Sequence, residues 1–336
     1  MLTSSQLLDF TNQYGIPLWG LDITVAAVLA FMTFAVLGIG VLVLVYMERK
    51  VSADIQIRWG PLHVGWHGSL QLVADVIKLM TKEDIFPTMA DRWIFRIAPA
   101  TMFIAAFIGF MVVPIGPNLV ARDLNIGLIY VLAVPAISVA GLIMAGFGSY
   151  SRYAILGSLR GAAQMVSYEV PRALSVIGVV MLAGTAKLST IVGMQHVWYV
   201  FLQPIAFIVF LISTIAEINR VPFDLPETES ELVAGYHTEY SGMRFVFFLF
   251  GEYISLIAAS ALTVILFLGG WHGFGPVFLA PFWFLVKMFA VIYLIMWIRW
   301  TIPRFRIDQV MELGWKVLLP IALANIVITG IVVTLL

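Results

Sequence analysis

The densest group of titratable side chains lies between two long apolar runs, in the stretch from Ala216 to Met243. This stretch reads AEINRVPFDLPETESELVAGYHTEYSGM and sets six acidic side chains against one base, Arg220. Carboxylates this close raise one another's pKa and titrate as a coupled set. Such a group can hold protons and pass them on. Its members are Glu217, Asp224, Glu227, Glu229, Glu231 and Glu239.

The local pattern predicts an ordered segment. Asp224 and Glu227 have the spacing of a capping box, and Pro226 fits the first turn of a helix. On that helix Glu227 and Glu231 would share a face, while Glu229 would point elsewhere. The alternative is a hydrated acidic loop that helps to set topology, and the local pattern leaves both interpretations open.

Composition places this stretch in a membrane protein. Of the 336 residues 61% are hydrophobic and 11% are charged, with a mean hydropathy of +1.00. Low-charge apolar runs of about 20 residues recur along the chain, which predicts an all-α, polytopic helix bundle forming one integral membrane domain over residues 1–336. The zero net charge and the lack of a basic patch exclude nucleic acid as a partner. Without cysteine, the chain cannot itself hold a disulfide or a thiolate iron–sulfur site.

About eight membrane spans are expected, and their connections alternate in charge. One side carries sixteen of the nineteen Lys and Arg residues, and every glutamate lies in or next to the same side. Because cytoplasmic connections are rich in Lys and Arg, this side faces inward and both termini face outward. The glutamates predict a polar chamber that opens to the inner face. The spans are roughly 22–46, 97–115, 126–148, 173–193, 197–215, 245–269, 281–299 and 317–335, and the inner connections are 47–96, 149–172, 216–244 and 300–316.

Three charges lie inside or beside spans. Glu252 is deep in the sixth span, where a charge facing lipid costs a few kcal/mol, so it should face the bundle interior or a water-lined cavity. Lys287 either reaches the outer interface or is an internal cation that balances the carboxylates. Glu169, two residues before Pro171, either pairs with Arg172 or belongs to a proton path.

The first inner connection contains an amphipathic segment, SLQLVADVIKLMTKE, with Gln71, Asp75, Lys78 and Lys82 at helical spacing. A 14-residue helix is about 21 Å long, too short to span, so it should lie along the inner interface. It is either a plain anchor or the lip of a lateral opening for a lipid-soluble molecule. His63 and His67, although four residues apart, stand among Gly and Pro, and we expect no metal site there.

Five motifs together resemble the quinone-site membrane subunit of respiratory complex I, which is the H subunit in the bacterial enzyme and the first subunit in the mitochondrial one. The match runs in order from Tyr46 to Lys316. One departure is Leu62-His63, where the family commonly has Asn-Arg. The motifs are ERK with a following Gln56-x-Arg58-x-Gly-Pro, LQLVADVIKLMTKE, LGSLRGAAQMVSYEVP, AEINRVPFDLPETESELVAGYHTEYSGM and RWTIPRFRIDQVMELGWK.

The resemblance implies a component of a proton-translocating NADH:quinone oxidoreductase without a complete active site of its own. Quinone would be the substrate, FMN and iron–sulfur clusters would lie in partner subunits, and the partners would be peripheral-arm subunits on the inner face with small and antiporter-like membrane subunits beside the chain. The implied quinone chamber involves Glu48, Arg49, Arg58, Asp75, Arg220 and Asp224. The implied proton path involves Glu169, Glu217, Glu227, Glu229, Glu231, Glu239 and Glu252, and Lys287 is its candidate balancing cation.

Three other functions stay open. The homologous membrane subunit of an energy-converting hydrogenase or F420-type dehydrogenase would share the acidic residues but use other electron donors. A stand-alone cation/proton transporter would be active when reconstituted alone, and a structural anchor would tolerate neutralisation of Glu252 or Glu231. We expect the bacterial plasma (inner) membrane rather than the mitochondrial inner membrane.

Overall fold

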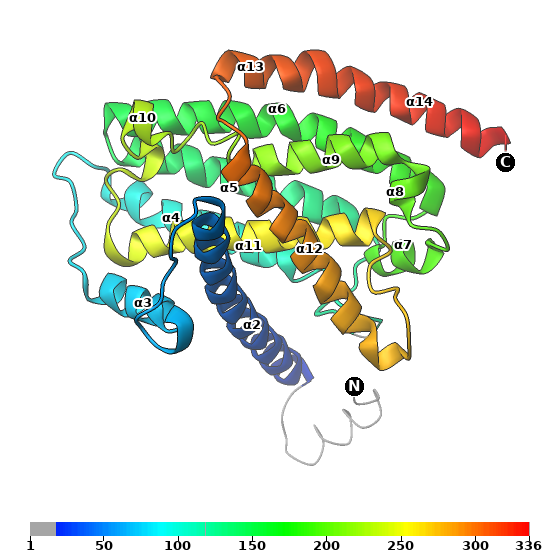
Figure 1. The fold of residues 1–336 in the computed structure, drawn as a ribbon, viewed down its shortest axis with the longest axis horizontal. Coiled ribbons are helices and arrows are strands. Elements are labelled where there is room, and N and C mark those ends of the chain that lie inside the picture. Colours follow the sequence, from blue (N-terminus) through cyan, green and yellow to red (C-terminus); the bar gives the residue numbers. More distant parts are fainter. Residues whose placement is uncertain (1–17, 118, 336) are drawn as a thin grey trace.

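The computed structural model describes residues 18–117 and 119–335. Within these ranges the chain is helical and contains no strand, which confirms the predicted all-α class. Figure 1 shows the bundle with α3 and α10 at its left end and α7 and α8 at its right end. The helices are α2 (Leu18–Ile55), α3 (Gln71–Thr81), α4 (Arg92–Phe110), α5 (Gly127–Gly148), α6 (Arg152–Ala183), α7 (Leu188–Met194), α8 (Tyr199–Leu202), α9 (Pro204–Glu217), α10 (Glu229–Leu232), α11 (Gly242–Phe267), α12 (Ala280–Thr301), α13 (Ile307–Glu312) and α14 (Leu319–Leu335), with a π-helical turn at Leu313–Leu318.

Seven helical segments of the described chain are long and apolar enough to cross a membrane. The fifth expected span, 197–215, is instead divided into α8 and α9 at Gln203. Pro204 explains the break, because proline fits the first turn of a helix but cannot donate a hydrogen bond inside one. With 14 residues, α9 alone is about 21 Å long and shorter than the ~30 Å hydrocarbon thickness. The chain nevertheless passes along α9 from the end of the bundle that holds α8 toward the end that holds α10 (Figure 1), so this crossing is kept.

Helix α6 differs from the expected fourth span at both ends. It begins at Arg152 rather than after Pro171, so most of the expected connection 149–172 is helical. Pro171 lies inside the helix, as membrane helices tolerate when neighbours satisfy the freed backbone groups. The helix stops at Gly184, whose φ of 66° is the left-handed conformation that glycine adopts without strain. Glu169 therefore lies within a 32-residue helix.

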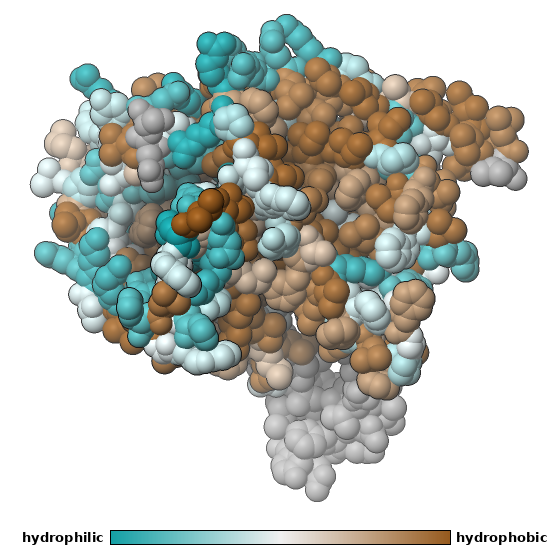
Figure 2. Space-filling view, in the orientation of Figure 1, coloured by the Kyte–Doolittle hydropathy of each residue, from teal (hydrophilic) through white to brown (hydrophobic). Residues whose placement is uncertain are grey.

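Polar residues gather at one end of the bundle, which we call the polar end. It comprises the residues that link α2 to α4, α9 to α11 and α12 to α13. The predicted amphipathic helix is present as α3 and packs against α2 and α11. Figure 2 shows hydrophilic residues concentrated over the left of the molecule and hydrophobic residues over α12 and α14.

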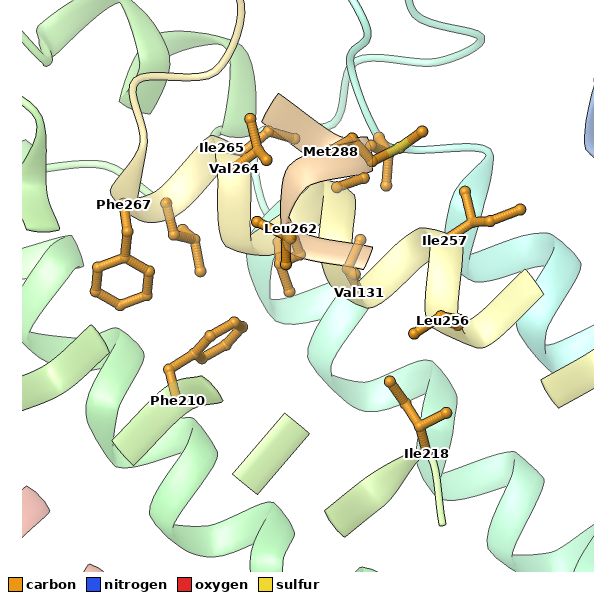
Figure 3. Close-up of a cluster of buried hydrophobic side chains, with 14 of the residues drawn as sticks. Val131, Phe210, Ile218, Leu256, Ile257, Leu262, Val264, Ile265, Phe267 and Met288 are labelled. Atoms are coloured by element: carbon orange, nitrogen blue, oxygen red, sulfur yellow. The ribbon is translucent and has the colours of Figure 1, made fainter. Parts of the chain in front are cut away.

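The opposite half is closed by apolar packing. Phe210 of α9 and Phe267 of α11 face one another with ring centroids 5.4 Å apart, and Leu262, Ile265 and Met288 fill the space beside them (Figure 3). All five side chains are buried. The polar and apolar halves of α11 therefore have different surroundings, and the titratable groups of the site lie in the polar half.

Candidate functional site

Arg220, in the connection after α9, is the centre of a buried group of charges. Its Nη1 lies 2.9 Å from Oε2 of Glu48 on α2, and its Nε lies 2.5 Å from Oε1 of Glu252 on α11. Its guanidinium also lies over the ring of Tyr253, 4.5 Å from the centroid. Burial alone would lower the pKa of Arg220, but Glu252 and Glu48 raise it well above its ordinary value. The guanidinium therefore stays charged.

Glu48 connects three of its neighbours. It forms ion pairs with Arg220 and with Arg299, in the last turn of α12, and it accepts a 2.8 Å hydrogen bond from the hydroxyl of Tyr253. Two cations and a hydroxyl thus satisfy a carboxylate that is 6% exposed. Breaking one of these buried pairs would leave an uncompensated charge. We call Glu48, Arg220, Glu252, Tyr253 and Arg299 the charge cluster.

A cavity of about 410 Å³ adjoins the charge cluster. Apolar residues of α2, α3 and α11 make most of its wall, and polar groups lie together in the remainder. Four of the six residues assigned to the chamber from the sequence lie in this wall, and the other two, Arg220 and Asp224, do not. We call this space the membrane cavity; the four are Glu48, Arg49, Arg58 and Asp75.

Arg49 and Asp75 join α2 to α3 across the membrane cavity. Arg49 Nη1 lies 2.6 Å from Asp75 Oδ2, and Gln71 donates to Asp75 Oδ1 at 3.3 Å. Burial alone would raise the pKa of Asp75, but the hydrogen bonds from Arg49 and Gln71 lower it below its ordinary value. The ionised pair holds the amphipathic helix against the side of the bundle.

Asp224 lies in the acidic connection, residues 216–244, and has a different environment. It is buried, with Oδ2 3.2 Å from Arg304, and its Oδ1 has no hydrogen-bond partner among the described residues. Burial, with the charge of Glu227, raises the pKa of Asp224 to about 7. A carboxyl group with this pKa can gain or lose a proton near neutral pH.

Glu227 is held by two aromatic residues of the same connection. Tyr236 donates a 3.1 Å hydrogen bond to Glu227 Oε1, and Nδ1 of His237 lies 3.7 Å from the same oxygen. Burial and the charge of Glu227 raise the pKa of Tyr236, so its hydroxyl keeps the proton that it donates. Glu227 and Asp224 are thus ordered within the connection rather than solvated.

The helix expected to begin after Asp224 begins later. The described helix, α10, starts at Glu229 and has four residues, and residues 221–228 form turns. The N-cap residue Thr228 forms no side-chain cap, and its hydroxyl donates to the carbonyl of Asp224 at 2.8 Å. The capping-box interpretation was wrong because the N-cap position of this helix is Thr228, four residues after Asp224. The side chain of Glu229 lies outside the described residues.

Helix α6 supports the acidic connection. The Gln164 amide nitrogen lies 2.6 Å from the carbonyl oxygens of Ala216 and Phe223, at the two ends of the bend. Gly157 is also required there, because a methyl group on it would lie 2.8 Å from the carbonyl oxygen of Pro226. The absence of a side chain at Gly157 therefore allows this connection to lie directly on α6.

Glu217, the last residue of α9, belongs to a second buried site. It pairs with Arg172 of α6, and both line a cavity of about 60 Å³ together with Ser138 and Ser255. That volume is enough for water. Arg172 therefore pairs with Glu217, whereas the sequence suggested Glu169 as one possible partner. The side chain of Glu169 is half-buried and forms no ion pair or hydrogen bond with another described residue.

The remaining predicted residues lie away from these groups. Glu231 is 56% exposed and pairs with Arg160 of α6 at 2.6 Å, and Glu239 is half-buried. Lys287 donates to the carbonyls of Leu268, Gly270 and His272 just beyond α11. Sixteen residues of helix separate Glu252 from Leu268, or about 24 Å. The structure therefore does not bring Lys287 to the carboxylates.

Sequence reasoning missed Tyr253, Arg299 and Arg304. Arg299 and Arg304 come from the end of α12 and the residues after it, and they supply bases that the acidic connection lacks. Their signal in the sequence is the basic run RWTIPRFR, on the same predicted side as the acidic residues. In the described part of the chain, no group of three or more His, Asp or Glu residues is arranged to hold a metal ion.

These features suit proton storage next to a site for an amphiphilic ligand. In a comparison with known proteins, the model of the NADH dehydrogenase family matches residues 27–330. An H subunit of the NADH-quinone oxidoreductase of Geobacter sulfurreducens is 45% identical over 345 residues, with 96% of this chain and 98% of the relative covered. An H subunit from Geobacter metallireducens is 50% identical over 322 residues, with 92% and 97% covered, and that of a Geobacillus species is 49% identical over 314 residues, with 91% and 90% covered. The chain therefore belongs to the NADH dehydrogenase family.

Proposed function

We propose that this chain is the H-type membrane component of an H⁺-translocating NADH-quinone oxidoreductase, in which it forms part of the quinone chamber and of the carboxylate path. The relatives from NADH-quinone oxidoreductases and the apolar helices support its place in that enzyme. One observation carries the finer proposal: Glu48 lies in the wall of the membrane cavity and is also a member of the buried charge cluster.

The membrane cavity has the chemistry of a quinone site. A quinone carries a flat ring with two carbonyl oxygens and a long apolar tail. Ligand sites typically combine apolar walls with a few convergent polar groups, and this cavity does so with Leu72, Val76 and Phe250 on one part and Arg49, Asp75 and Glu48 on another. Helix α3, held by the Arg49–Asp75 pair, forms the side of the cavity that faces away from the bundle core.

Coupling would act through shared partners. Reduction of a quinone takes up two electrons, which the iron–sulfur partner subunits would supply, and two protons to give a neutral quinol. The charge in the chamber would therefore change between electron uptake and proton uptake in each turnover. A change beside Glu48 alters how strongly it holds Arg220, and Arg220 in turn binds Glu252. Charges in a poorly solvated site act on one another strongly, so this rearrangement changes how readily the neighbouring carboxyl groups bind protons.

Further along, the path would use Asp224, Glu227 and the Arg172–Glu217 pair beside its water-sized cavity. Glu169, Glu229 and Glu239 remain predicted members. The proposed path leaves out Glu231, which is 56% exposed, and Lys287, which binds backbone carbonyls beyond α11. Neighbouring antiporter-like subunits would receive the protons, and peripheral-arm subunits on the polar end would hold FMN and iron–sulfur clusters. The polar end would face the bacterial cytoplasm and both termini the periplasm.

The proposal is tested by Glu217→Gln in the intact complex. We expect the complex to assemble with a lower melting temperature, because Arg172 loses its buried partner. Quinone reductase activity and proton pumping per assembled complex should both fall together, because an amide cannot exchange a proton. Glu312→Gln, which changes an exposed carboxylate paired with Lys316, is the matched control and should leave both activities unchanged. Normal pumping in Glu217→Gln would remove Glu217 from the path.

Copurification separates this function from its rivals. Gentle solubilisation should recover the chain with subunits carrying FMN and iron–sulfur clusters and with antiporter-like subunits. Hydrogenase subunits in their place would identify the enzyme as an energy-converting hydrogenase. Cation or proton transport by the purified chain alone in liposomes would instead support a stand-alone transporter.

A further inference from the structure

The connection between α11 and α12, residues 268–279, has an apolar and aromatic surface. It contains no Asp, Glu, Lys or Arg, and it ends in a turn of 3₁₀ helix, Val277–Leu279. The side chains of Phe274, Val277 and Phe278 are 87%, 76% and 78% exposed. Figure 1 shows this connection at the right of the molecule, at the end that holds α7 and α8 and away from the polar end. We call residues 268–279 the apolar connection. Its large exposed side chains are unfavourable in water.

Neighbouring aromatic side chains extend the same surface. A methyl group on Gly269 would lie 2.8 Å from the ring of Trp198, so this tryptophan lies directly against the apolar connection. Phe201 is exposed and stacks on Trp198 with ring centroids 6.3 Å apart, and Phe282, in the first turn of α12, is exposed as well. Tryptophan is enriched in membrane proteins at the level where the bilayer meets water. The aromatic surface is therefore wider than the connection alone.

The backbone of the apolar connection is hydrogen-bonded by the chain itself. The Nζ of Lys287 donates to three of its carbonyls, and the indole nitrogen of Trp283 donates to a fourth at 2.7 Å. Two more accept from backbone N–H groups within the connection. Water satisfies the backbone of an ordinary exposed loop, whereas a backbone in lipid depends on donors from the protein. The six carbonyls belong to Leu268, Gly269, Gly270, His272, Phe274 and Pro276.

Charged residues at this end of the bundle lie in a different connection, residues 111–126 between α4 and α5. Arg122 and Asp123 are exposed there, and Asp123 pairs at 2.9 Å with Lys187, which follows α6. A protein partner typically meets a polar rim and forms several hydrogen bonds. The apolar connection offers no charged side chain, and six of its carbonyls are already bonded. These properties favour lipid over a protein as its neighbour.

We propose that the apolar connection is immersed in the lipid leaflet away from the polar end, with Phe274, Val277 and Phe278 among the acyl chains. The charged connection 111–126 then lies further out, at the headgroups and water. The immersed rings anchor the first turn of α12 at a fixed depth, and Lys287 supplies the donors that the lipid lacks. This inference is independent of the proposed function, because it requires only that the bundle crosses a membrane.

The test places a spin label on the apolar connection in the intact complex, reconstituted into phosphatidylcholine vesicles. Because the chain has no cysteine, Phe278→Cys introduces the only thiol of this subunit. We expect oxygen, which dissolves in lipid, to broaden the spectrum of the label, and a water-soluble nickel complex on both sides of the membrane to leave it unchanged. Asn125→Cys, at an exposed position of the charged connection, is the matched control, and nickel should broaden its spectrum. The wild-type complex, treated in the same way, gives the background from thiols of partner subunits.

Two results would overturn the proposal. Broadening by the nickel complex at position 278 would mean that the connection lies in water, and protection from both oxygen and nickel would mean that a partner subunit covers it. Should Phe278→Cys not assemble, Val277→Cys takes the label at a similarly exposed position, and the same two results count against immersion.

The melting temperature of the complex gives a second readout. Phe278→Leu should match the wild type, whereas Phe278→Asp should melt at a lower temperature, because a charged side chain in lipid is costly. Equal melting temperatures in these two variants would contradict immersion.

Discussion

The two ends of α11 solve the same problem, a charge within an apolar bundle, in different ways. Just beyond the carboxyl end, Lys287 is satisfied by three backbone carbonyls, which are fixed in place. In the amino-terminal half, Glu252 pairs with Arg220, which also pairs with Glu48. Glu48 in turn pairs with Arg299 and accepts a hydrogen bond from Tyr253. Backbone carbonyls are fixed partners, whereas side chains that share partners can exchange them. Under the proposed function, the first end stabilises the fold and the second also responds to a ligand.

The largest effect is expected from removing Arg220, the cation that Glu48 and Glu252 share. Arg220→Gln leaves Glu48 and Glu252 buried with fewer partners, which should cost about 3–5 kcal/mol of stability and abolish quinone reduction. Thermal unfolding of the purified complex and membrane quinone reductase assays measure both effects. Arg220→Lys keeps the charge but loses the planar fork and should give an intermediate result. Activity close to wild type in Arg220→Gln would show that the charge cluster has no role in turnover.

The pH dependence of the polar end follows from Asp224. Its pKa is raised to about 7 by burial and by Glu227, so the folded protein holds a proton that the unfolded chain has released. The stability from this proton is complete below about pH 4 and is lost as the pH rises toward 7. The melting temperature of the wild type should therefore fall from pH 5 to pH 8, and Asp224→Asn should flatten this decline. A steeper decline in the variant would contradict the raised pKa.

The other end of α11 should affect stability alone. Lys287→Met leaves three carbonyls without their donor and should cost about 1–3 kcal/mol, measured as a lower melting temperature. Quinone reductase activity per assembled complex should stay at the wild-type level, because this end has no contact with the charge cluster. Lys187→Met, which removes a partly exposed cation paired with Asp123, is a control for loss of a positive charge. Impaired pumping at unchanged stability would return Lys287 to the proton path.

The smallest effect is expected at the surface of the polar end. Glu231 is 56% exposed, and its pair with Arg160 is screened by solvent. Glu231→Gln should change stability by less than about 1 kcal/mol and leave quinone reduction nearly unchanged. Melting and activity assays alongside Glu252→Gln measure the contrast. Equal losses in the two variants would mean that burial does not decide which carboxylates matter.

The sequence predicted the features that depend on local pattern. Hydropathy identified the membrane bundle, and the 3.6-residue period identified α3. The resemblance brought together Glu48, Arg49, Arg58 and Asp75, which line one cavity although up to 27 positions separate them. The bundle, α3 and the cavity residues could be predicted because each is encoded by a short stretch of sequence or by a motif.

What could not be predicted depends on contacts between distant segments. Arg299 reaches Glu48 across 251 positions, and Arg172 meets Glu217 rather than Glu169 because the direction of a side chain on α6 is set by the whole bundle. The effect of two prolines on the helix boundaries was also predicted wrongly. Pro171 lies within α6, while Pro204 begins α9, and only the neighbouring helices distinguish the two cases.

Two glycines of α6 determine how close the acidic connection can lie to this helix. A methyl group at Gly157 would press on the backbone at Pro226, and one at Gly161 would lie 2.6 Å from the ring of the same proline. A side chain at either position acts as a wedge that displaces one whole segment, so Asp224 and Glu227 would move together. The position of these two carboxyl groups relative to α2 and α11 thus depends on two glycines that have no side chain. A substitution of either glycine should therefore have the same effect on function as a substitution of the titratable residues themselves.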